Sequence, residues 1–461
     1  MSISHEDIKN VYFVGAGGIG MSALERYFNS RDISVAGYDR TPTRLTETLQ
    51  AEGIDIVFDD DDALIPERFR NPADTLVVFT PAVPESHRGL SWFRRNGFTV
   101  MKRSEVLGLI TAPTKSICFS GTHGKTTTSS MAAHALAVEG TGSNAFLGGV
   151  LRNYGSNLLL SADSPFSVVE ADEFDRSFHR LRPYIAVVTA TDPDHLDIYG
   201  TPEAYRESFA RFTELIKPGG KLLVNLGATF TPRPPEGVDV FTYSRDVGDY
   251  HAAKIRRSEG HIAFDLIGPG EKLLVADIEP GVPVEVNIEN TVAALAALDL
   301  AGHLDADAAR RAMASYQGAE RRFEYRLRRP DHIIIDDYAH HPREIEASIA
   351  SVKALYPSKK LTVVFQPHLY SRTRDFAADF SRALSGADEV ILVPLYPARE
   401  EPIPGVGSEM LLPAITAPVK LMTTADELAG LLASRGFEVL EVLGAGNIDD
   451  RIPEIINALP K

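Results

Sequence analysis

The sequence predicts an α/β protein of three domains: an N-terminal Rossmann-like domain, a central domain of the P-loop ATPase type and a C-terminal Rossmann-like domain. Three observations predict this class. Short apolar runs typical of buried parallel strands alternate with helical segments. Two glycine-rich turns each stand between such a strand and a helix. The length of 461 residues suits about three domains. We place the domains at residues 1–112, 113–316 and 317–461.

The composition argues against several classes of function. The formal net charge of -16 argues against a protein that holds nucleic acid through a basic surface, so anionic ligands need local cations and helix ends. No apolar run approaches the roughly 20 residues of a membrane span, and the polar first residues do not suggest a secretory signal. We therefore expect a cytoplasmic protein without a membrane span. The only cysteine, Cys118, lies in an apolar run and is expected to be structural.

The first domain opens with a strand at residues 11–14, a glycine turn at 15–20 (GAGGIG) and a helix at 21–29. The next strand, 34–38, ends in Asp39. This arrangement is the dinucleotide-type fingerprint, in which the acidic residue suits a ribose hydroxyl. The same turn can bind the pyrophosphate of a nicotinamide cofactor or of a nucleotide-sugar, and both remain open from these residues.

The central domain begins with a second glycine turn, SGTHGKTTT at residues 120–128, between an apolar strand at 117–119 and a helix at 129–138. The backbone N–H groups of such a turn can cradle phosphate oxygens. Lys125 would reach the outer phosphates, and a hydroxyl of Thr126 or Thr127 would bind magnesium. The spacing departs from the standard loop, because Phe119 stands where the first glycine is expected.

Two later strands of this domain end in polar residues. The strand at 167–169 runs into Glu170, and the strand at 185–189 precedes His195. In an open parallel sheet the carboxyl edge is where ligands bind, so both side chains should lie beside the phosphate loop. A carboxylate is a suitable magnesium ligand and an imidazole a less usual one. A hydrogen-bonded structural role for His195 is the alternative.

The rest of the central domain has a helix at 204–215, a strand at 221–225 and a β-rich stretch at 232–283 without evident chemistry. A helix at 287–300 carries Asn287 and Asn290 on one face of its first turn. Asparagine is a common helix cap, so capping and ligand binding are both open for these two residues.

The third domain repeats the pattern of strand, polar loop and helix. A strand at 332–335 ends in DDYAHHP (336–342), and a strand at 360–365 ends in QPHLYSRTR (366–374). Two more strands follow at 389–393 and 439–443. Since polar loops gather at the carboxyl edge of such a sheet, this domain should contribute side chains to a cleft shared with the others.

These motifs resemble those of the ATP-dependent Mur ligases of peptidoglycan synthesis, over essentially the whole chain and in the same order. The motifs are GAGGIGMS (15–22), GTHGKTTT (121–128), EADEFD (170–175), Asp194 with His195, Asn287 with Asn290, RRF (321–323), DDYAHHP (336–342) and QPHLYSRT (366–373). Within the family the chain is most similar to the alanine-adding branch, because the first glycine fingerprint and the His-His-Pro of the third domain also agree.

The resemblance implies an ADP-forming ligase that uses ATP and Mg²⁺ to join L-alanine to the carboxylate of UDP-N-acetylmuramate through an acyl phosphate. It implies catalytic roles for Lys125, Glu170, His195 and Arg322, and magnesium binding by Thr126, Glu170 and His195. It implies ATP contacts at Gly121, Thr122, His123, Gly124, Lys125, Thr126, Thr127, Asn287, Asn290, Arg322 and Asp337. The UDP-sugar would be held by Gly17, Gly18, Ile19, Gly20, Asp39, Thr80 and Arg103. The amino acid would be received by Tyr338, His340, His341 and Arg372.

Two departures from the family pattern qualify these assignments. Leu369 stands where the family often has arginine, so anchoring of the amino-acid carboxylate should fall more on Arg372. Residues 205–212 contain no lysine, whereas several sister ligases place a carbamylated lysine there, and this absence suits the alanine-adding branch.

Three other functions compete with this interpretation. A sister ligase that attaches a preformed tripeptide to the same UDP-sugar would differ mainly in the third domain. An NAD-dependent dehydrogenase would use the first glycine turn and Asp39 but would leave Lys125, Glu170 and His195 without a role. A non-catalytic nucleotide-binding protein would not need the full set of phosphoryl-transfer groups. The sequence does not indicate an oligomeric state.

Overall fold

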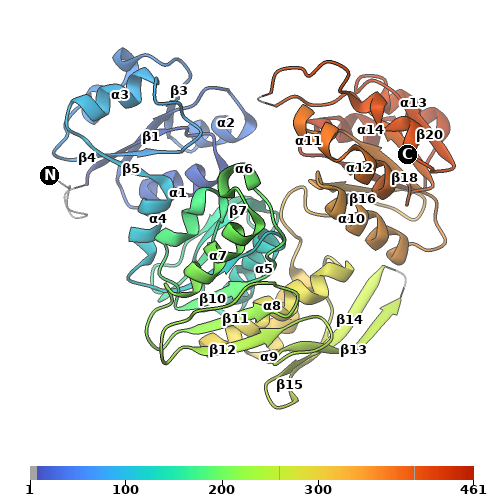
Figure 1. Cartoon of the computed structure of the whole chain (residues 1–461), viewed down its shortest axis with the longest axis horizontal. Coiled ribbons are helices and arrows are strands. Elements are labelled where there is room, and N and C mark those ends of the chain that lie inside the picture. The colour runs from blue at the N-terminus through green and yellow to red at the C-terminus, as the bar shows by residue number, and fades with distance from the viewer. Residues whose placement is uncertain (1–7, 259, 399, 461) are drawn as a thin grey trace. The chain divides into compact units, whose positions relative to one another are not determined.

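The computed structural model describes residues 8–258, 260–398 and 400–460. The chain forms two compact units. The first comprises residues 1–253, 265–278 and 289–316, and the second comprises residues 254–264, 279–288 and 317–461. Figure 1 shows the elements of both units along the chain. None of the described helices is long and apolar enough to cross a membrane.

The first unit opens with a five-stranded parallel sheet of order β3-β2-β1-β4-β5. Its strands are β1 (Asn10–Val14), β2 (Ser34–Tyr38), β3 (Asp55–Val57), β4 (Thr75–Phe79) and β5 (Thr99–Lys102). The connecting helices are α1 (Ile19–Asn29), α2 (Arg44–Ala51), α3 (Arg88–Arg95) and α4 (Arg103–Thr111). All five residues of β1 are buried, as expected for a central strand covered on both faces.

A seven-stranded sheet follows in the same unit, of order β12-β11-β10-β6-β9-β7-β8 and parallel except for the pair β7 and β8. Its strands are β6 (Lys115–Ser120), β7 (Asn144–Leu151), β8 (Ser156–Leu159), β9 (Phe166–Glu170), β10 (Ile185–Val188), β11 (Lys221–Asn225) and β12 (Asp239–Tyr243). Its helices are α5 (Lys125–Glu139), α6 (Leu196–Tyr199) and α7 (Pro202–Thr213). Strand β6 lies between β10 and β9, so the loop after it faces the ends of both neighbours.

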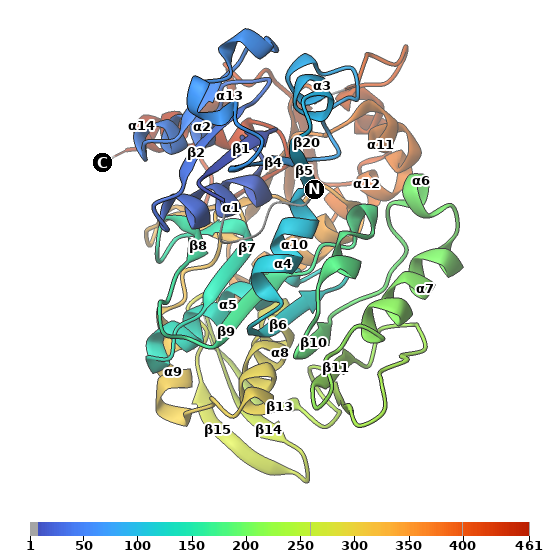
Figure 2. The ribbon, with the colours of Figure 1, turned by 90° about the vertical axis from the view of Figure 1, so that its left-hand side faces the viewer.

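Helix α1 packs on β7 and β8, so the first glycine turn is fixed to the second sheet (Figure 2). The buried Asn157 makes hydrogen bonds across this contact. Its Nδ2 donates to Ile19 O at 2.6 Å and to Ser22 Oγ at 3.1 Å, while its Oδ1 accepts from Arg26 Nη1 at 2.6 Å. Because a buried amide with its hydrogen bonds made has one favoured geometry, this residue holds the turn in register with β8.

The stretch predicted to be β-rich forms a three-stranded sheet of β13 (His251–Ser258), β14 (His261–Gly268) and β15 (Lys272–Ile278). Helices α8 (Glu285–Ala301) and α9 (Ala306–Ser315) follow, and α9 packs on α5. There the Oγ of Ser130 and the Oη of Tyr316 lie 2.5 Å apart.

The second unit carries a six-stranded sheet of order β16-β17-β21-β18-β19-β20, in which only the β16–β17 pair of the described strands is antiparallel. Its strands are β16 (Glu324–Arg328), β17 (Ile333–Asp337), β18 (Leu361–Phe365), β19 (Glu389–Leu392), β20 (Val419–Met422) and β21 (Val439–Leu443). Its helices are α10 (Pro342–Leu355), α11 (Tyr370–Asp375), α12 (Ala377–Leu384), α13 (Leu428–Arg435) and α14 (Ile452–Ala458).

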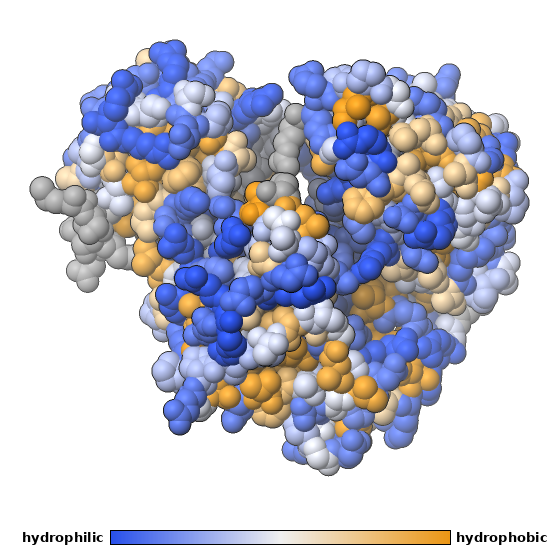
Figure 3. All heavy atoms as spheres, viewed as in Figure 1, coloured by the Kyte–Doolittle hydropathy of each residue, from blue (hydrophilic) through white to orange (hydrophobic). Residues whose placement is uncertain are grey.

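The predicted α/β class is confirmed, and most predicted strands lie within two residues of the observed ones. The differences fall at helix starts. Helix α5 begins at Lys125 instead of residue 129, because the Lys-Thr-Thr-Thr run forms its first turn. Figure 3 shows one face of the molecule, where hydrophilic residues cover much of each unit with apolar residues scattered among them.

Candidate active site

The loop between β6 and α5 is held open by two glycines and tied to the end of β10. Gly121 has φ +140°, and a Cβ there would lie 2.7 Å from Ala190 N; Gly124 has φ +82°. Thr122 anchors the loop, since its N donates to Ala190 O at 3.0 Å and its Oγ1 donates to Asp192 O at 2.7 Å. No side chain caps the start of α5 at Gly124. The first N–H groups of this helix are therefore available to an anion, as predicted for a phosphate loop.

Lys125, at the first position of α5, forms a buried ion pair with Glu173. Its Nζ lies 2.9 Å from Glu173 Oε2 and also donates to Gly121 O at 2.5 Å and Thr122 O at 3.3 Å. Burial alone would lower the pKa of Lys125, but Glu173, Glu170 and Asp172 outweigh it and raise that pKa. The lysine is thus a fixed cation inside its own loop.

Sequence reasoning assigned no role to Glu173. Its side chain is only 2% exposed, and burial raises its pKa to about 7 against the opposing charge of Lys125. The residue lies inside the EADEFD motif, so its position was visible in the sequence, but nothing there indicated that it pairs with a lysine 48 residues earlier.

Thr126 and Glu170 form the pair of oxygen ligands that the sequence predicted for a cation. Thr126 Oγ1 donates to Glu170 Oε1 at 3.0 Å, and Gly148 N donates to Glu170 Oε2 at 2.9 Å. A Cβ on Gly148 would lie 2.5 Å from Glu170 Cδ, so only glycine leaves room for this carboxylate. Hydroxyl and carboxylate oxygens are the donors that Mg²⁺ prefers, together with substrate phosphates and water. The residues present therefore fit a magnesium ion.

His195 lies beside Glu173 and Asp194. Its Nε2 is 3.9 Å from Glu173 Oε1 and 3.7 Å from Asp194 Oδ2, and its ring contacts Phe174 edge-on. Its backbone has φ +51°, a left-handed conformation that is uncommon outside glycine. Within the described ranges, no three His, Cys, Asp or Glu side chains gather closely enough to hold a metal by themselves. The magnesium role of His195 stays a prediction.

Asp39 binds the first glycine turn. Its Oδ2 accepts from Gly17 N at 2.6 Å, and its Oδ1 accepts from Thr41 N at 3.1 Å. A carboxylate oxygen has more than one acceptor site, so a ribose hydroxyl can still donate to it. Its contact with the nucleotide remains a prediction.

A pocket of about 340 Å³ joins the first glycine turn to the cation ligands. It brings together five of the residues predicted for the UDP-sugar and one predicted for the metal. Its lining is Gly18, Ile19, Gly20, Met21, Ala23, Thr80, Arg103, Leu107, Phe146, Leu147, Gly148, Glu170 and Asp172. Arg103 supplies its positive charge, with Nη2 3.4 Å from Asp172 Oδ2.

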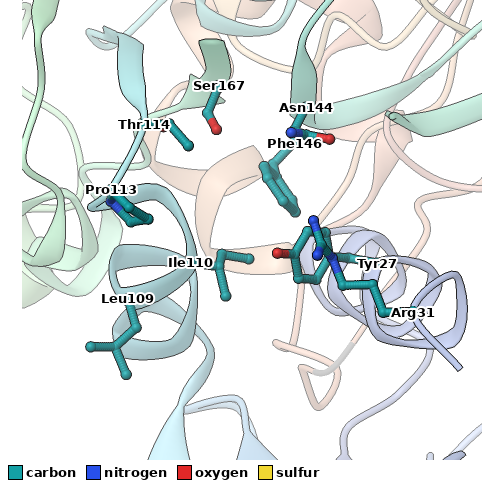
Figure 4. A pocket seen from close by; sticks show the side chains of 9 residues that line it. All are labelled: Tyr27, Arg31, Leu109, Ile110, Pro113, Thr114, Asn144, Phe146 and Ser167. Carbon is teal, nitrogen blue, oxygen red and sulfur yellow. The ribbon is translucent and has the colours of Figure 1, made fainter. Parts of the chain in front are cut away.

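A second pocket of about 360 Å³ contains none of the predicted site residues (Figure 4). It is lined by Tyr27, Arg31, Leu109, Ile110, Pro113, Thr114, Asn144, Phe146 and Ser167. The Arg31 guanidinium lies over the Tyr27 ring, 4.5 Å from its centroid.

The two asparagines of α8 are both buried. Thr128 Oγ1 donates to Gly124 O at 2.8 Å and lies 3.3 Å from Asn290 Oδ1, which places Asn290 against the phosphate-loop helix. Asn287 Nδ2 donates to Val282 O at 3.0 Å. Since α8 begins at Glu285, neither asparagine is its N-cap, and the capping alternative is wrong.

In the second unit, the two arginines of the RRF motif flank Tyr338 but differ in their partners. Arg321 donates to Gly444 O at 2.5 Å and Gly446 O at 2.8 Å and lies 3.1 Å from Asp449 Oδ1. Arg322 stacks over the Tyr338 ring at 5.3 Å, and in the part of the chain that the structure describes it has no carboxylate within ion-pair distance. Arg322 is therefore the arginine whose charge is available for a ligand.

Asp337 ends β17 with a half-buried carboxylate whose Oδ1 accepts from Ala339 N at 3.1 Å and whose Oδ2 accepts from Ser348 Oγ at 2.7 Å. Burial raises its pKa, although Ser348 and Arg322 oppose this. His340 follows in the same loop, with Nδ1 2.9 Å from Tyr338 O. Burial lowers the pKa of His340 and Arg372 lowers it further, although the charge of Glu344 opposes them.

The remaining residues predicted for the amino acid lie at helix starts. His341 is the N-cap of α10, where its Nδ1 accepts from Arg343 N at 3.4 Å, and Arg372 lies on α11. Leu369, at the start of α11, has φ +71°, a strained conformation for a side chain of its size. The loop therefore keeps an unusual backbone at the position where this chain departs from the family pattern.

Comparison with known protein families accounts for most of the chain. Residues 10–114 match the family described as Mur ligase family, catalytic domain; residues 119–298 match Mur ligase middle domain; and residues 321–437 match Mur ligase, glutamate ligase domain. The first two matches cover the two glycine turns, and the third covers the polar loops after β17 and β18.

Individual relatives are similar to this chain over nearly its full length. The chain is 55% identical to the UDP-N-acetylmuramate–L-alanine ligase of Parabacteroides distasonis over 98% of this chain and 97% of that protein. It is 53% identical to that of Phocaeicola vulgatus, over 98% and 99%. Among solved structures, the UDP-N-acetylmuramate-alanine ligase of Thermotoga maritima matches with a TM-score of 0.82 and 25% identity, over 97% and 98% of the two chains. A murein peptide ligase of Psychrobacter arcticus shares the fold, with a TM-score of 0.67 and 18% identity.

Proposed function

This chain belongs to the Mur ligase family, and we propose that it is the alanine-adding ligase, which joins L-alanine to the carboxylate of UDP-N-acetylmuramate with conversion of ATP to ADP and phosphate. The pocket that joins the first glycine turn to Glu170 is the observation that carries this function. A sugar nucleotide held by the turn would present its carboxylate beside the phosphate loop, where a phosphoryl group can be transferred to it.

The chemistry requires activation of a poor electrophile. A carboxylate oxygen attacks the γ-phosphorus of ATP, the bond to the ADP oxygen breaks, and an acyl phosphate forms. The neutral amine of L-alanine then attacks the acyl carbon, and phosphate leaves with the electron pair of the C–O bond. The first step brings two anions together, so positive groups must offset their repulsion.

The phosphate loop supplies these positive groups from within the first unit. The N–H groups at the start of α5 face the ATP phosphates, and Lys125 neutralises charge on the transferred phosphoryl group. In the present geometry Lys125 is paired with Glu173, at 2.9 Å. ATP phosphates compete with Glu173 for the ammonium group, so Glu173 keeps the lysine positioned until the nucleotide arrives.

Thr126 and Glu170 would hold magnesium, with His195 as an additional ligand. When bound, the ion would withdraw negative charge from the β- and γ-phosphoryl oxygens. Gly148 N donates to the other oxygen of Glu170, so the carboxylate is held through both of its oxygens.

The second unit is proposed to serve ATP and the amino acid. Arg322, with no carboxylate partner among the residues described, would offset charge on the phosphates, and Asp337 would bind the nucleotide. Asn287 and Asn290 would contact the nucleotide as well. Tyr338, His340, His341 and Arg372 would receive L-alanine, with Arg372 as the anchor of its carboxylate. In this scheme residues 1–112, 113–316 and 317–461 act as UDP-sugar, ATP and amino-acid domains.

Two other functions are disfavoured. A dehydrogenase would not need the Lys125, Thr126 and Glu170 arrangement at a second loop. The murein peptide ligase of Psychrobacter arcticus shares the fold at 18% identity, whereas the alanine ligases reach 55%. We further propose that the protein works in the cytoplasm, where UDP-sugar precursors and ATP are available.

Phosphate release from ATP tests the function. Release should require UDP-N-acetylmuramate and L-alanine together, and the product should have the mass of the alanyl adduct. Release that needs the tripeptide would reassign the chain to the sister ligase. Loss of ATP turnover with every acceptor would contradict the ligase assignment.

A further inference from the structure

The hydroxyl of Ser348 lies between the half-buried carboxyl group of Asp337 and the buried carboxyl group of Glu441. Ser348 Oγ, on α10, is 2.7 Å from Asp337 Oδ2 and 2.6 Å from Glu441 Oε1. Glu441 lies in the middle of β21, next to β17 and β18, and is fully buried. Sequence reasoning gave neither Ser348 nor Glu441 a role.

The hydrogen bonds among Asp337, Ser348 and Glu441 limit how many protons these three side chains can carry. A hydroxyl has one proton and can donate to only one of its two neighbours. If both carboxyl groups were ionised, Ser348 could donate to only one of them. The facing oxygen of the other carboxylate would then lie at hydrogen-bond distance from the Ser348 lone pairs with no proton between the two atoms. One of the two carboxyl groups must therefore carry a proton and donate it to Ser348 Oγ.

The contacts of each group indicate which carboxyl is neutral. Asp337 Oδ1 accepts from Ala339 N at 3.1 Å, and the charge of Arg322 favours the ionised form of Asp337. Glu441 has no cation nearby in the described structure, and its Oε2 is buried without a hydrogen-bond partner there. Burying an ionised oxygen without a hydrogen-bond partner costs much free energy, whereas burying a neutral carbonyl oxygen in the same way costs less. Burial and the nearby Asp337 raise the pKa of Glu441 to about 8, with Ser348 opposing, which agrees with a neutral acid.

We propose that Glu441 is a positioning residue: its protonated carboxyl donates to Ser348 Oγ, which donates to Asp337 Oδ2 and so holds an ionised Asp337 in one orientation for ATP. The assignment rests on the proposed function, because Asp337 is given its role there. The arrangement fixes Asp337 on both oxygens, from Ala339 and Ser348, while adding no second negative charge beside the nucleotide.

Infrared difference spectroscopy tests the proton directly and does not depend on turnover. The spectrum of the wild-type protein minus that of Glu441→Gln at pH 7 should contain the carbonyl band of a protonated carboxylic acid, and the band should shift in D₂O. Gln is isosteric and neutral and keeps an N–H donor for Ser348, so the variant should fold. Absence of such a band in the wild-type protein would overturn the proposal.

Steady-state kinetics test the positioning role. Ser348→Ala should raise the KM for ATP about tenfold, the effect of one hydrogen bond to a charged group, with the KM values for the UDP-sugar and L-alanine unchanged. Ser351→Ala is the matched control, since Ser351 lies on the same helix and bonds only to Ala347 O in the described structure. Glu441→Gln should stay within about twofold of the wild-type KM. Glu441→Leu, which removes the donor to Ser348 but leaves the Ser348–Asp337 bond, should raise the KM less than Ser348→Ala does.

The outcomes distinguish a failure of the proposed function from a failure of the inference about Glu441. If wild-type protein shows the band but no turnover with UDP-N-acetylmuramate and L-alanine, the proposed function fails while the shared proton stands. If turnover occurs but the band is missing, or if Ser348→Ala and Ser351→Ala have the same KM for ATP, the inference about Glu441 is wrong.

Discussion

Replacement of Gly148 by alanine should displace Glu170 while leaving the fold intact. Gly148 lies in β7, and its N–H donates to Glu170 Oε2 at 2.9 Å. The new Cβ would start 2.5 Å from Glu170 Cδ, whereas two carbon atoms in ordinary contact are about 3.5 Å apart. The carboxyl group must therefore retreat by about 1 Å.

A shift of that size removes Glu170 from both of its partners. Its hydrogen bonds to Thr126 Oγ1 and Gly148 N, now 3.0 and 2.9 Å, would lengthen beyond hydrogen-bond range. Misplacement of a reacting or ligating group by about 1 Å can cost about 10²-fold in rate. We expect kcat to fall by about 10²-fold.

The assay is phosphate release at saturating substrates, with thermal unfolding measured in parallel. Gly430→Ala is the control, because a Cβ there meets no described atom within 4 Å; it should leave kcat unchanged and stabilise α13 by about 0.5–1 kcal/mol. In a Glu170→Ala background, Gly148→Ala should cause little further loss. An unchanged kcat in Gly148→Ala, or an equally large loss in that background, would show that Gly148 does not act through Glu170.

Three further changes give distinct results. Lys125→Ala should abolish phosphate release because the transferred phosphoryl group loses its fixed cation, while calorimetry should still detect UDP-N-acetylmuramate; retained turnover would remove the lysine from the mechanism. Arg372→Ala should raise the KM for L-alanine at least about tenfold, through loss of a charge-assisted hydrogen bond, and an unchanged value would place the anchor elsewhere. Glu25 is fully buried, with no hydrogen-bond partner for either oxygen in the described chain, and burial raises its pKa well above the usual range. Because the folded state then keeps a proton that the unfolded state releases above about pH 4.3, wild-type stability falls as pH rises. Glu25→Met should therefore be more stable than wild type in urea unfolding at pH 8, with a smaller difference at pH 5, and a pH-independent difference would contradict this.

The sequence predicted the parts of the site that depend on the ends of strands. Glu170 ends β9 and Asp337 ends β17, and each follows an apolar run that can hardly be anything but a buried strand. Because parallel strands place their carboxyl ends at one edge, the order of motifs along the chain was enough to predict that these residues gather in loops at the edges of sheets.

Pairings between distant segments could not be predicted in the same way. Glu173 pairs with Lys125, and Ser348 bonds to Glu441 across 93 positions of the chain. Such contacts depend on side-chain packing after the sheets have formed, and a glutamate in the middle of an apolar strand gives no sign of its partner. The sequence left a helix-capping role for Asn287 and Asn290 undecided for a related reason. The first residue of α8 is set by the preceding turn and not by the asparagines.

Activation of the UDP-N-acetylmuramate carboxylate by ATP can be followed through the oxygen atoms of that carboxylate. The most direct measurement uses UDP-N-acetylmuramate labelled with ¹⁸O in that carboxylate, with the phosphate released during turnover with L-alanine analysed by mass spectrometry. Each phosphate should carry one ¹⁸O atom, because the oxygen that attacks the γ-phosphorus leaves with it. Formation of the alanyl amide together with unlabelled phosphate, so that the displaced ¹⁸O appears in another product, would contradict this mechanism.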